Sequence, residues 1–137
     1  MFSAFDPWSK ALKDSADEAW TCDGKLLDFM PFNLVYENGK LQAFDQEWIY
    51  KDRLLLSHLL YRGFYHTLTR MMPLRKSTRH DIAVFSDLFN RFIKWQNLPE
   101  GCPVSMDYLR WQEEKLMRSI HGFARFRSVR DFPIQYM

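Results

Sequence analysis

Three side chains that could ligate a cation stand close together in the chain: Asp28, Asn33 and Asp45. A hard cation such as Mg²⁺ favours carboxylate and carbonyl oxygens, and it completes its octahedron with water and phosphate during phosphoryl transfer. Asn33 and Asp45 are the natural ligands in such an arrangement. Asp28 would lie opposite them, near an acceptor hydroxyl, as a base or orienting group. These residue types therefore indicate metal-assisted phosphoryl-transfer chemistry.

A β-hairpin must position two of these side chains. Residues 33–37 and 40–45 contain β-branched, aromatic and alternating apolar positions, and Asn38-Gly39 lies between them. Asn-Gly is a strong hairpin signal because a type I′ turn needs positive φ at both central residues. Strands are therefore predicted over 33–37 and 40–45, running antiparallel.

The polar side chains should converge at the open end of this hairpin. Asn33 begins the first strand and Asp45 ends the second, so antiparallel pairing places them together. Asp28 lies five residues before Asn33. Pro31 stiffens the loop between them because it fixes its own φ and lacks an N–H donor. All three oxygen-bearing side chains are thus expected at one place.

The order Asp28-x-x-Pro31-x-Asn33, a short hairpin and Asp45-x-Glu47 resembles the catalytic core of the protein-kinase-like superfamily. The likeness is greatest to the aminoglycoside and choline phosphotransferase type. The resemblance implies that Asp28 is the catalytic aspartate, that Asn33 and Asp45 bind the metal, and that Pro31 and Glu47 support the site. It also implies Mg²⁺ and ATP as cofactors.

The resemblance covers residues 25–48 and includes two departures. Leu26 stands where the family usually has a histidine, and Met30 stands where it usually has a lysine or histidine. Both changes argue against turnover more than against the fold.

A narrower resemblance concerns the same segment. Leu27-Asp28-x-x-Pro-x-Asn followed by Phe44-Asp-Gln-Glu-Trp48 is similar to segments attached to bacterial methyltransferases and glycosyltransferases of surface-polysaccharide synthesis. This likeness implies a transferase-associated role in cell-surface polysaccharide modification.

Each of these residues also has a purely structural interpretation. An aspartate shortly before a proline often forms an Asx-turn, and an acid that ends a strand often caps the next turn. Short motifs alone match by chance. The order, the spacing and the hairpin together favour the kinase-like interpretation.

An amphipathic helix is expected ahead of the loop, over residues 6–20. Asp6-Pro7 provides a capping acid before a proline at the first helical position. Asp23-Gly24 then begins the turn into the loop.

Three further helices are expected behind the hairpin, within residues 52–130. Apolar residues four apart predict the first over 52–72, ended by Pro73. Similar stripes predict helices over 81–95 and from 106 to about 123, separated by a Pro- and Gly-rich break.

The predicted fold is α+β and mostly helical, with one β-hairpin after an N-terminal helix and three helices behind it. In terms of the resemblance this is a kinase C-lobe without its N-lobe, because the chain has five glycines and no Gly-x-Gly-x-x-Gly. Residues 1–137 are expected to form one domain or a domain fragment. The chain alone is expected to be inactive.

The composition predicts a partner. Hydrophobic residues make up 47% of the chain and aromatic residues 17%, which is a heavy load for one small domain. Surplus apolar surface usually marks a partner protein or a missing neighbouring domain. A non-catalytic helical protein-interaction module is therefore the alternative function.

Charge, cysteines and hydropathy argue against several other classes, nucleic-acid binding among them. The net charge of +2 does not demand nucleic acid or an anionic membrane. The arginine- and aromatic-rich stretch 121–130 could stack on single-stranded bases, but covering a neighbouring core is the commoner use. Cys22 and Cys102 show no metal-finger spacing, and no secretory signal or membrane span is found. A cytoplasmic location is expected.

Overall fold

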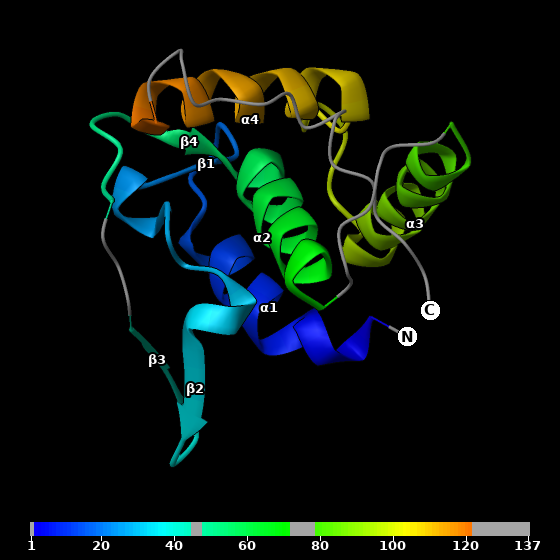
Figure 1. Ribbon diagram of the computed structural model, residues 1–137. Coiled ribbons are helices and arrows are strands. Elements are labelled where there is room, and N and C mark those ends of the chain that lie inside the picture. The colour runs from blue at the N-terminus through cyan, green and yellow to red at the C-terminus, as the bar shows by residue number, and fades with distance from the viewer. Residues whose placement is uncertain (1, 45–47, 72–78, 122–137) are drawn as a thin grey trace. The chain divides into compact units, whose positions relative to one another are not determined.

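The computed structural model describes residues 2–44, 48–71 and 79–121 of the chain (Figure 1). Contacts divide the chain into two compact units, residues 1–67 and 68–137. The fold is α+β and mostly helical, as predicted. Pro73 and residues 122–130, on which parts of the helix predictions fall, lie outside the described residues.

The first unit combines short strands with two long helices. Its elements in chain order are η1 (Ser3–Phe5), α1 (Asp6–Ser15), β1 (Thr21–Cys22), η2 (Gly24–Leu26), η3 (Pro31–Asn33), β2 (Leu34–Glu37), β3 (Lys40–Ala43), β4 (Leu54–Leu55) and α2 (Leu56–Met71), whose last turn belongs to the second unit.

The predicted hairpin is confirmed as β2 and β3. The strands are antiparallel, with Leu34 opposite Ala43 and Glu37 opposite Lys40. Asn38 and Gly39 have φ of 52° and 77°, so both central residues have the positive φ that a type I′ turn requires. In Figure 1 the tip of the hairpin points away from α2.

A second, smaller sheet was not predicted. β1 and β4 pair antiparallel, with Thr21 opposite Leu55 and Cys22 opposite Leu54. The helix expected from residue 52 therefore begins later, at Leu56. The apolar residues at 54 and 55 fit a helical stripe equally well, and only the distant partner strand makes them extended.

The helix expected over 6–20 ends at Ser15, because the next residues form a different hydrogen-bonded turn. Ala16 is extended, with φ −75° and ψ 144°. The carboxylate of Asp17 accepts the backbone N–H groups of Ala19 and Thr21 at 3.0 and 2.9 Å. An aspartate side chain that binds nearby backbone donors competes with helix continuation in this way.

The core of the first unit lies between α1 and α2. A Cβ atom added at Gly63 of α2 would lie 2.1 Å from Cζ2 of Trp8 in α1, so only glycine permits this approach. The indole N–H of Trp8 donates to the Phe29 carbonyl at 2.8 Å. Trp8 therefore ties the predicted catalytic loop to both helices.

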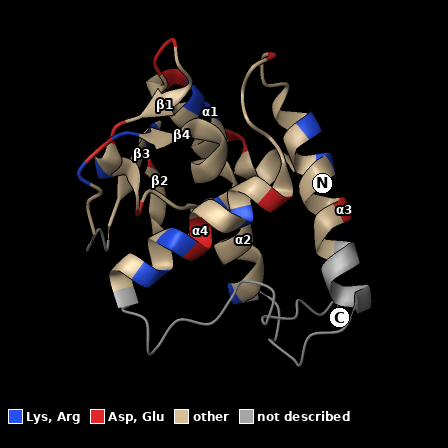
Figure 2. Cartoon of the chain, turned by 90° about the horizontal axis from the view of Figure 1, so that it is seen from above, with Lys and Arg blue, Asp and Glu red and all other residues tan. Residues whose placement is uncertain are grey.

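The second unit contains α3 (Arg79–Gln96) and α4 (Met106–His121), which agree closely with the predicted helices. Their buried apolar side chains recur at helical spacing: Phe85, Phe89, Phe92 and Ile93 on α3, and Leu109 and Leu116 on α4. Both acidic and basic residues lie along α4 (Figure 2).

Candidate functional site

Asp28 lies in the loop between η2 and η3, and backbone hydrogen bonds hold the loop on both sides of this residue. The N–H of Leu27 donates to the Gly24 carbonyl, and the N–H of Met30 donates to the Asp28 carbonyl at 2.9 Å. Asp28 as a whole is only 7% exposed. Its carboxylate is therefore held inside the first unit and not at an open surface.

Both oxygens of the Asp28 carboxylate contact donors. Oδ2 accepts the backbone N–H of Trp48 at 2.7 Å. Oδ1 forms an ion pair with Arg62 of α2, at 3.7 Å from the guanidinium. The same guanidinium donates through Nε to the Leu27 carbonyl at 3.2 Å. Arg62 thus contacts both the Asp28 carboxylate and the backbone of the loop.

Arg62 lies deep within the first unit and has a further neighbour. Its side chain is 5% exposed, and that of Asp28 is 10% exposed. Buried charges are rarely found in folded proteins unless they are paired. Nη1 of Arg62 also approaches Nε2 of His66, one turn further along α2, at 3.4 Å. We call the residues Asp28, Trp48 and Arg62 the loop clasp.

Asn33 is close to Asp28, as predicted, but it contacts the backbone and not the carboxylate. Its side-chain N–H₂ group donates to the Asp28 carbonyl oxygen at 3.0 Å. The backbone carbonyl of Asn33 accepts the N–H of Phe44 at 2.9 Å, directly beyond β3. Asn33 therefore closes the loop and starts the hairpin. Pro31 begins η3, where its missing N–H leaves no helical bond unmade.

The metal site expected at Asn33 and Asp45 remains a prediction. Asp45 and Glu47 lie outside the described residues. Within the described part of the chain, no cluster of three or more His, Cys, Asp or Glu residues could hold a metal ion. Among these residues, the Asn33 amide oxygen and an arginine-paired carboxylate do not by themselves fit the oxygen shell that Mg²⁺ requires. No catalytic step through Mg²⁺ or ATP follows from this arrangement.

Arg62 and Trp48 were missed from the sequence. Arg62 contacts a loop 35 positions away, and no local pattern specifies such a partner. One signal was present, because Arg62 lies within the apolar stretch of α2. A charged residue with apolar neighbours on a helix, such as Arg62 between Tyr61 and Phe64, indicates a buried counter-charge.

A second acid–arginine pair lies in the same unit, at the surface. Oδ2 of Asp17 accepts the Thr21 hydroxyl at 2.8 Å and the Nε of Arg53 at 3.0 Å. The amide and hydroxyl of Thr21, assisted by Arg53, lower the pKa of Asp17 from its ordinary value of 3.8. Trp20, inside this turn, has a φ of 59°. We call Asp17, Thr21 and Arg53 the surface clasp.

Comparison with known proteins gives no assignment, since no protein-family model, curated protein or solved structure matches the chain. In the described residues, no helix has both the length and the apolar character needed to cross a membrane.

Proposed function

We propose that this chain is a non-catalytic protein-interaction module in which a kinase-like loop serves as a structural element. The observation that carries the proposal is the loop clasp. The Asp28 carboxylate is buried and in contact with the Trp48 N–H and the Arg62 guanidinium. A general base must instead reach the proton that it abstracts.

The departures from the kinase-like pattern support the same proposal. Leu26 and Met30 flank Asp28 and have no proton to exchange, where the family usually carries ionisable side chains. Met30 is buried. Leu26 and Met30 are thus suited to packing and not to phosphate.

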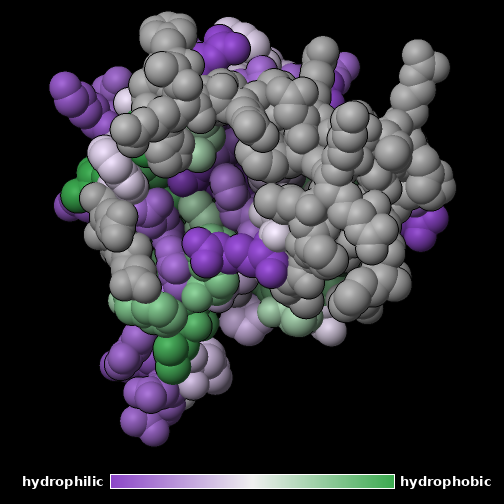
Figure 3. Space-filling model, in the orientation of Figure 1, coloured by the Kyte–Doolittle hydropathy of each residue, from purple (hydrophilic) through white to green (hydrophobic). Residues whose placement is uncertain are grey.

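The surface that would meet a partner lies next to the loop clasp. The Asp28 carboxylate accepts the backbone N–H of Trp48, which is 47% exposed, and the next residue, Ile49, is 70% exposed. Tyr50 is exposed as well. Figure 3 shows further hydrophobic side chains, in green, near the base of the β2–β3 hairpin. Aromatic residues are enriched among the side chains that dominate protein–protein binding.

The narrower resemblance indicates the partner class. It is a methyltransferase or glycosyltransferase of surface-polysaccharide synthesis, or a nucleotide-binding lobe of a kinase-like domain. In either case the apolar residues 48–50 would be covered in the complex.

Calorimetric titration of the chain with Mg²⁺ and ATP tests the proposal. We expect no saturable binding of ATP with Mg²⁺ present, and the same result for Asn33→Ala. Saturable, Mg²⁺-dependent ATP binding that Asn33→Ala abolishes without a loss of stability would contradict it.

The exposed apolar residues are tested with an environment-sensitive apolar dye. The folded chain should bind the dye, and Trp48→Ser with Ile49→Ser should reduce the signal several-fold. Lys25→Ser, an exposed position on η2, is the matched control and should leave the signal unchanged. A native chain that binds no dye would count against an interaction surface here.

A phosphotransferase completed by a nucleotide-binding lobe is the second candidate. It is favoured by the contact between Asn33 and the Asp28 backbone, which places two residues of the kinase-like pattern together. With such a lobe supplied, Asp45→Ala should abolish Mg²⁺-dependent nucleotide binding and leave the fold intact. Unchanged nucleotide affinity in that variant would exclude this candidate.

A further inference from the structure

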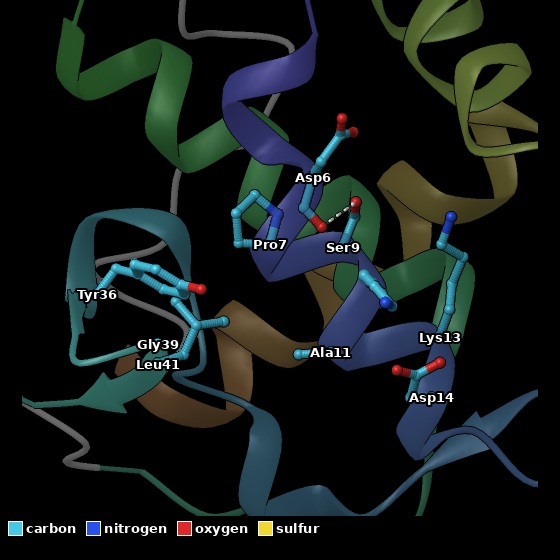
Figure 4. A pocket seen from close by; sticks show the side chains of 10 residues that line it. Asp6, Pro7, Ser9, Ala11, Lys13, Asp14, Tyr36, Gly39 and Leu41 are labelled. Carbon is cyan, nitrogen blue, oxygen red and sulfur yellow. Dashed lines mark hydrogen bonds between the residues drawn. The ribbon is translucent and has the colours of Figure 1, made fainter.

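A groove of about 750 Å³ lies between α1 and the β2–β3 hairpin, within the first unit. In Figure 4, Pro7 and Ala11 lie on the side of α1 nearest to Tyr36 and Leu41 of the hairpin. Tyr36 is 63% exposed. One wall of the groove is therefore a helix face and the other is a pair of cross-strand neighbours.

Apart from the buried Ser9, the residues of α1 that line this groove lie outside the face that α1 buries. Pro7, Lys10, Ala11 and Asp14 line the groove and follow the spacing i, i+3, i+4, i+7, which places them on one stripe. The opposite stripe includes Trp8 and Leu12, both buried. The groove stripe thus has the small residue Ala11 near its centre, with the charged residues Lys10 and Asp14 on either side of it.

The two charges on this stripe have opposite sign and no partner in the part of the chain that the structure describes. Lys10 and Asp14 are both exposed. Neither takes part in an ion pair or side-chain hydrogen bond among the described residues. They lie four residues apart on α1, that is, about one helical turn.

This arrangement is self-complementary under two-fold symmetry. When two such helices pack antiparallel with their centres at residue 12, Lys10 of each copy lies opposite Asp14 of the other. A two-fold interface uses the same patch on both subunits, so each favourable pair occurs twice. Ala11 near the crossing point allows the helix axes to approach to about 8 Å, the lower end of the usual range.

We propose that the groove face of α1 binds the same face of a second copy of this chain, forming a two-fold dimer with two Lys10–Asp14 ion pairs. Tyr36 and Leu41 cover the flanks of the helix pair. A two-stranded hairpin alone is marginal in water and gains stability by packing against a helix. The second copy supplies such a helix.

A second copy fits this face better than other ligands. Asp6 and Asp14 line the groove together with Lys10 and Lys13, so the two signs are balanced and give no net attraction for a phosphate-bearing ligand. An unrelated protein would need both charges at the matching interval, whereas a second α1 carries them by necessity.

The dimer should be weak, because α1 has ten residues and spans only about 15 Å. Exposed ion pairs also contribute little individually and are screened by salt. The experiment therefore measures the full chain by sedimentation equilibrium from about 10 to about 500 micromolar, the range in which weak association is resolved.

Charge exchange tests the predicted pairing. Lys10→Glu replaces two attractions by two repulsions, and we expect it to raise the dimer Kd about 30-fold. Asp14→Lys should act similarly. The double variant Lys10→Glu with Asp14→Lys restores opposite charges across the interface, and its Kd should return to within about threefold of the original. Circular dichroism verifies that each variant is folded.

Lys25→Glu is the matched control, because it reverses an exposed lysine outside the groove. Its Kd should equal that of the original chain. A monomer at every concentration would overturn the proposal. Failure of the double variant to restore association, or a loss as large in Lys25→Glu, would overturn it as well.

Discussion

The loop clasp and the surface clasp use the same chemistry in two different environments. In both, an aspartate pairs with an arginine from a later segment and accepts backbone N–H groups, that of Trp48 at Asp28 and those of Ala19 and Thr21 at Asp17. The side chains of Asp28 and Arg62 are 10% and 5% exposed, whereas those of Asp17 and Arg53 are 41% and 48% exposed. Burial therefore sets how much each pair contributes to stability. Water screens the exposed pair, whereas the buried pair depends on its contacts within the protein.

The difference bears on how a kinase-like motif should be interpreted. Asp17 belongs to no recognisable pattern, while Asp28 matches a catalytic aspartate. The contacts of the two residues are nevertheless alike, since each carboxylate accepts a backbone N–H and pairs with an arginine. Asp28 differs chiefly in being buried, which favours a structural role and not access to substrate.

The largest expected effect is the loss of the arginine from the loop clasp. Arg62→Met leaves the Asp28 carboxylate buried without its cation and the Leu27 carbonyl without its donor. Breaking a buried ion pair in this way should lower the free energy of unfolding by about 3 to 5 kcal/mol. Urea denaturation followed by tryptophan fluorescence measures it.

Arg53→Met is the comparison variant for this experiment. It removes from the surface clasp a guanidinium that likewise pairs with an aspartate. The loss in the free energy of unfolding should be clearly smaller than for Arg62→Met, because water can replace the exposed guanidinium. Equal losses in the two variants would show that burial does not distinguish the clasps.

The next effect concerns the charge of Asp28 itself. Asp28→Asn keeps an acceptor for the Trp48 N–H but removes the counter-charge of Arg62. We expect a loss of about 2 to 4 kcal/mol in the free energy of unfolding. A purely catalytic aspartate would tolerate this substitution with full stability.

A smaller effect is expected at the surface clasp in acid. Because the native pKa of Asp17 is lowered from 3.8, its contribution to stability is present above pH 3.8 and is lost as the pH falls through the native pKa. The Tm difference between the original chain and Asp17→Asn should therefore be seen at about pH 6 and vanish in strong acid. A difference that persists unchanged at low pH would contradict this assignment.

The smallest effect lies at the alkaline end. Cys22, on β1 beside the surface clasp, is buried, and burial raises the pKa of its thiol to about 11. A raised native pKa gives stability that is complete below the unfolded value of 9.0 and is lost as the pH rises through about 11. Cys22→Ala should remove this part of the alkaline decline. An identical decline in both proteins would assign it to other groups.

Local sequence signals predicted much of the fold. Asn38-Gly39 specified the hairpin because the turn chemistry resides in those two residues. The three later helices followed from apolar stripes, and tertiary pairing overrides such a stripe only at Leu54 and Leu55, which join β1. By contrast, the pairing of Thr21 with Leu55 and of Arg62 with Asp28 joins residues more than thirty positions apart. The early end of α1 depends on which acceptor the backbone N–H groups of Ala19 and Thr21 bind. Both bind the Asp17 carboxylate.

The metal ligands predicted for the candidate site remain a prediction, because Asp45 lies outside the described residues. The proximity of Asn33 to Asp28 is observed, whereas the ion pair between Arg62 and the Asp28 carboxylate was not predicted. Residue order and spacing show which side chains a loop can bring together. They do not show which charged side chain of a distant helix will contact that loop. Here that side chain is Arg62, and its ion pair with Asp28 is the basis for assigning Asp28 a structural role.

A double-mutant cycle on Asp28→Asn and Arg62→Met tests the structural role of Asp28 most directly. The free energies of unfolding of the original chain, both single variants and the double variant are measured by urea denaturation under one condition. If the two side chains stabilise the loop as a pair, the losses will not add, and the coupling should be about 2 kcal/mol or more. Losses that add to within about 0.5 kcal/mol would mean that Asp28 and Arg62 act independently, and the structural account of this loop would be wrong.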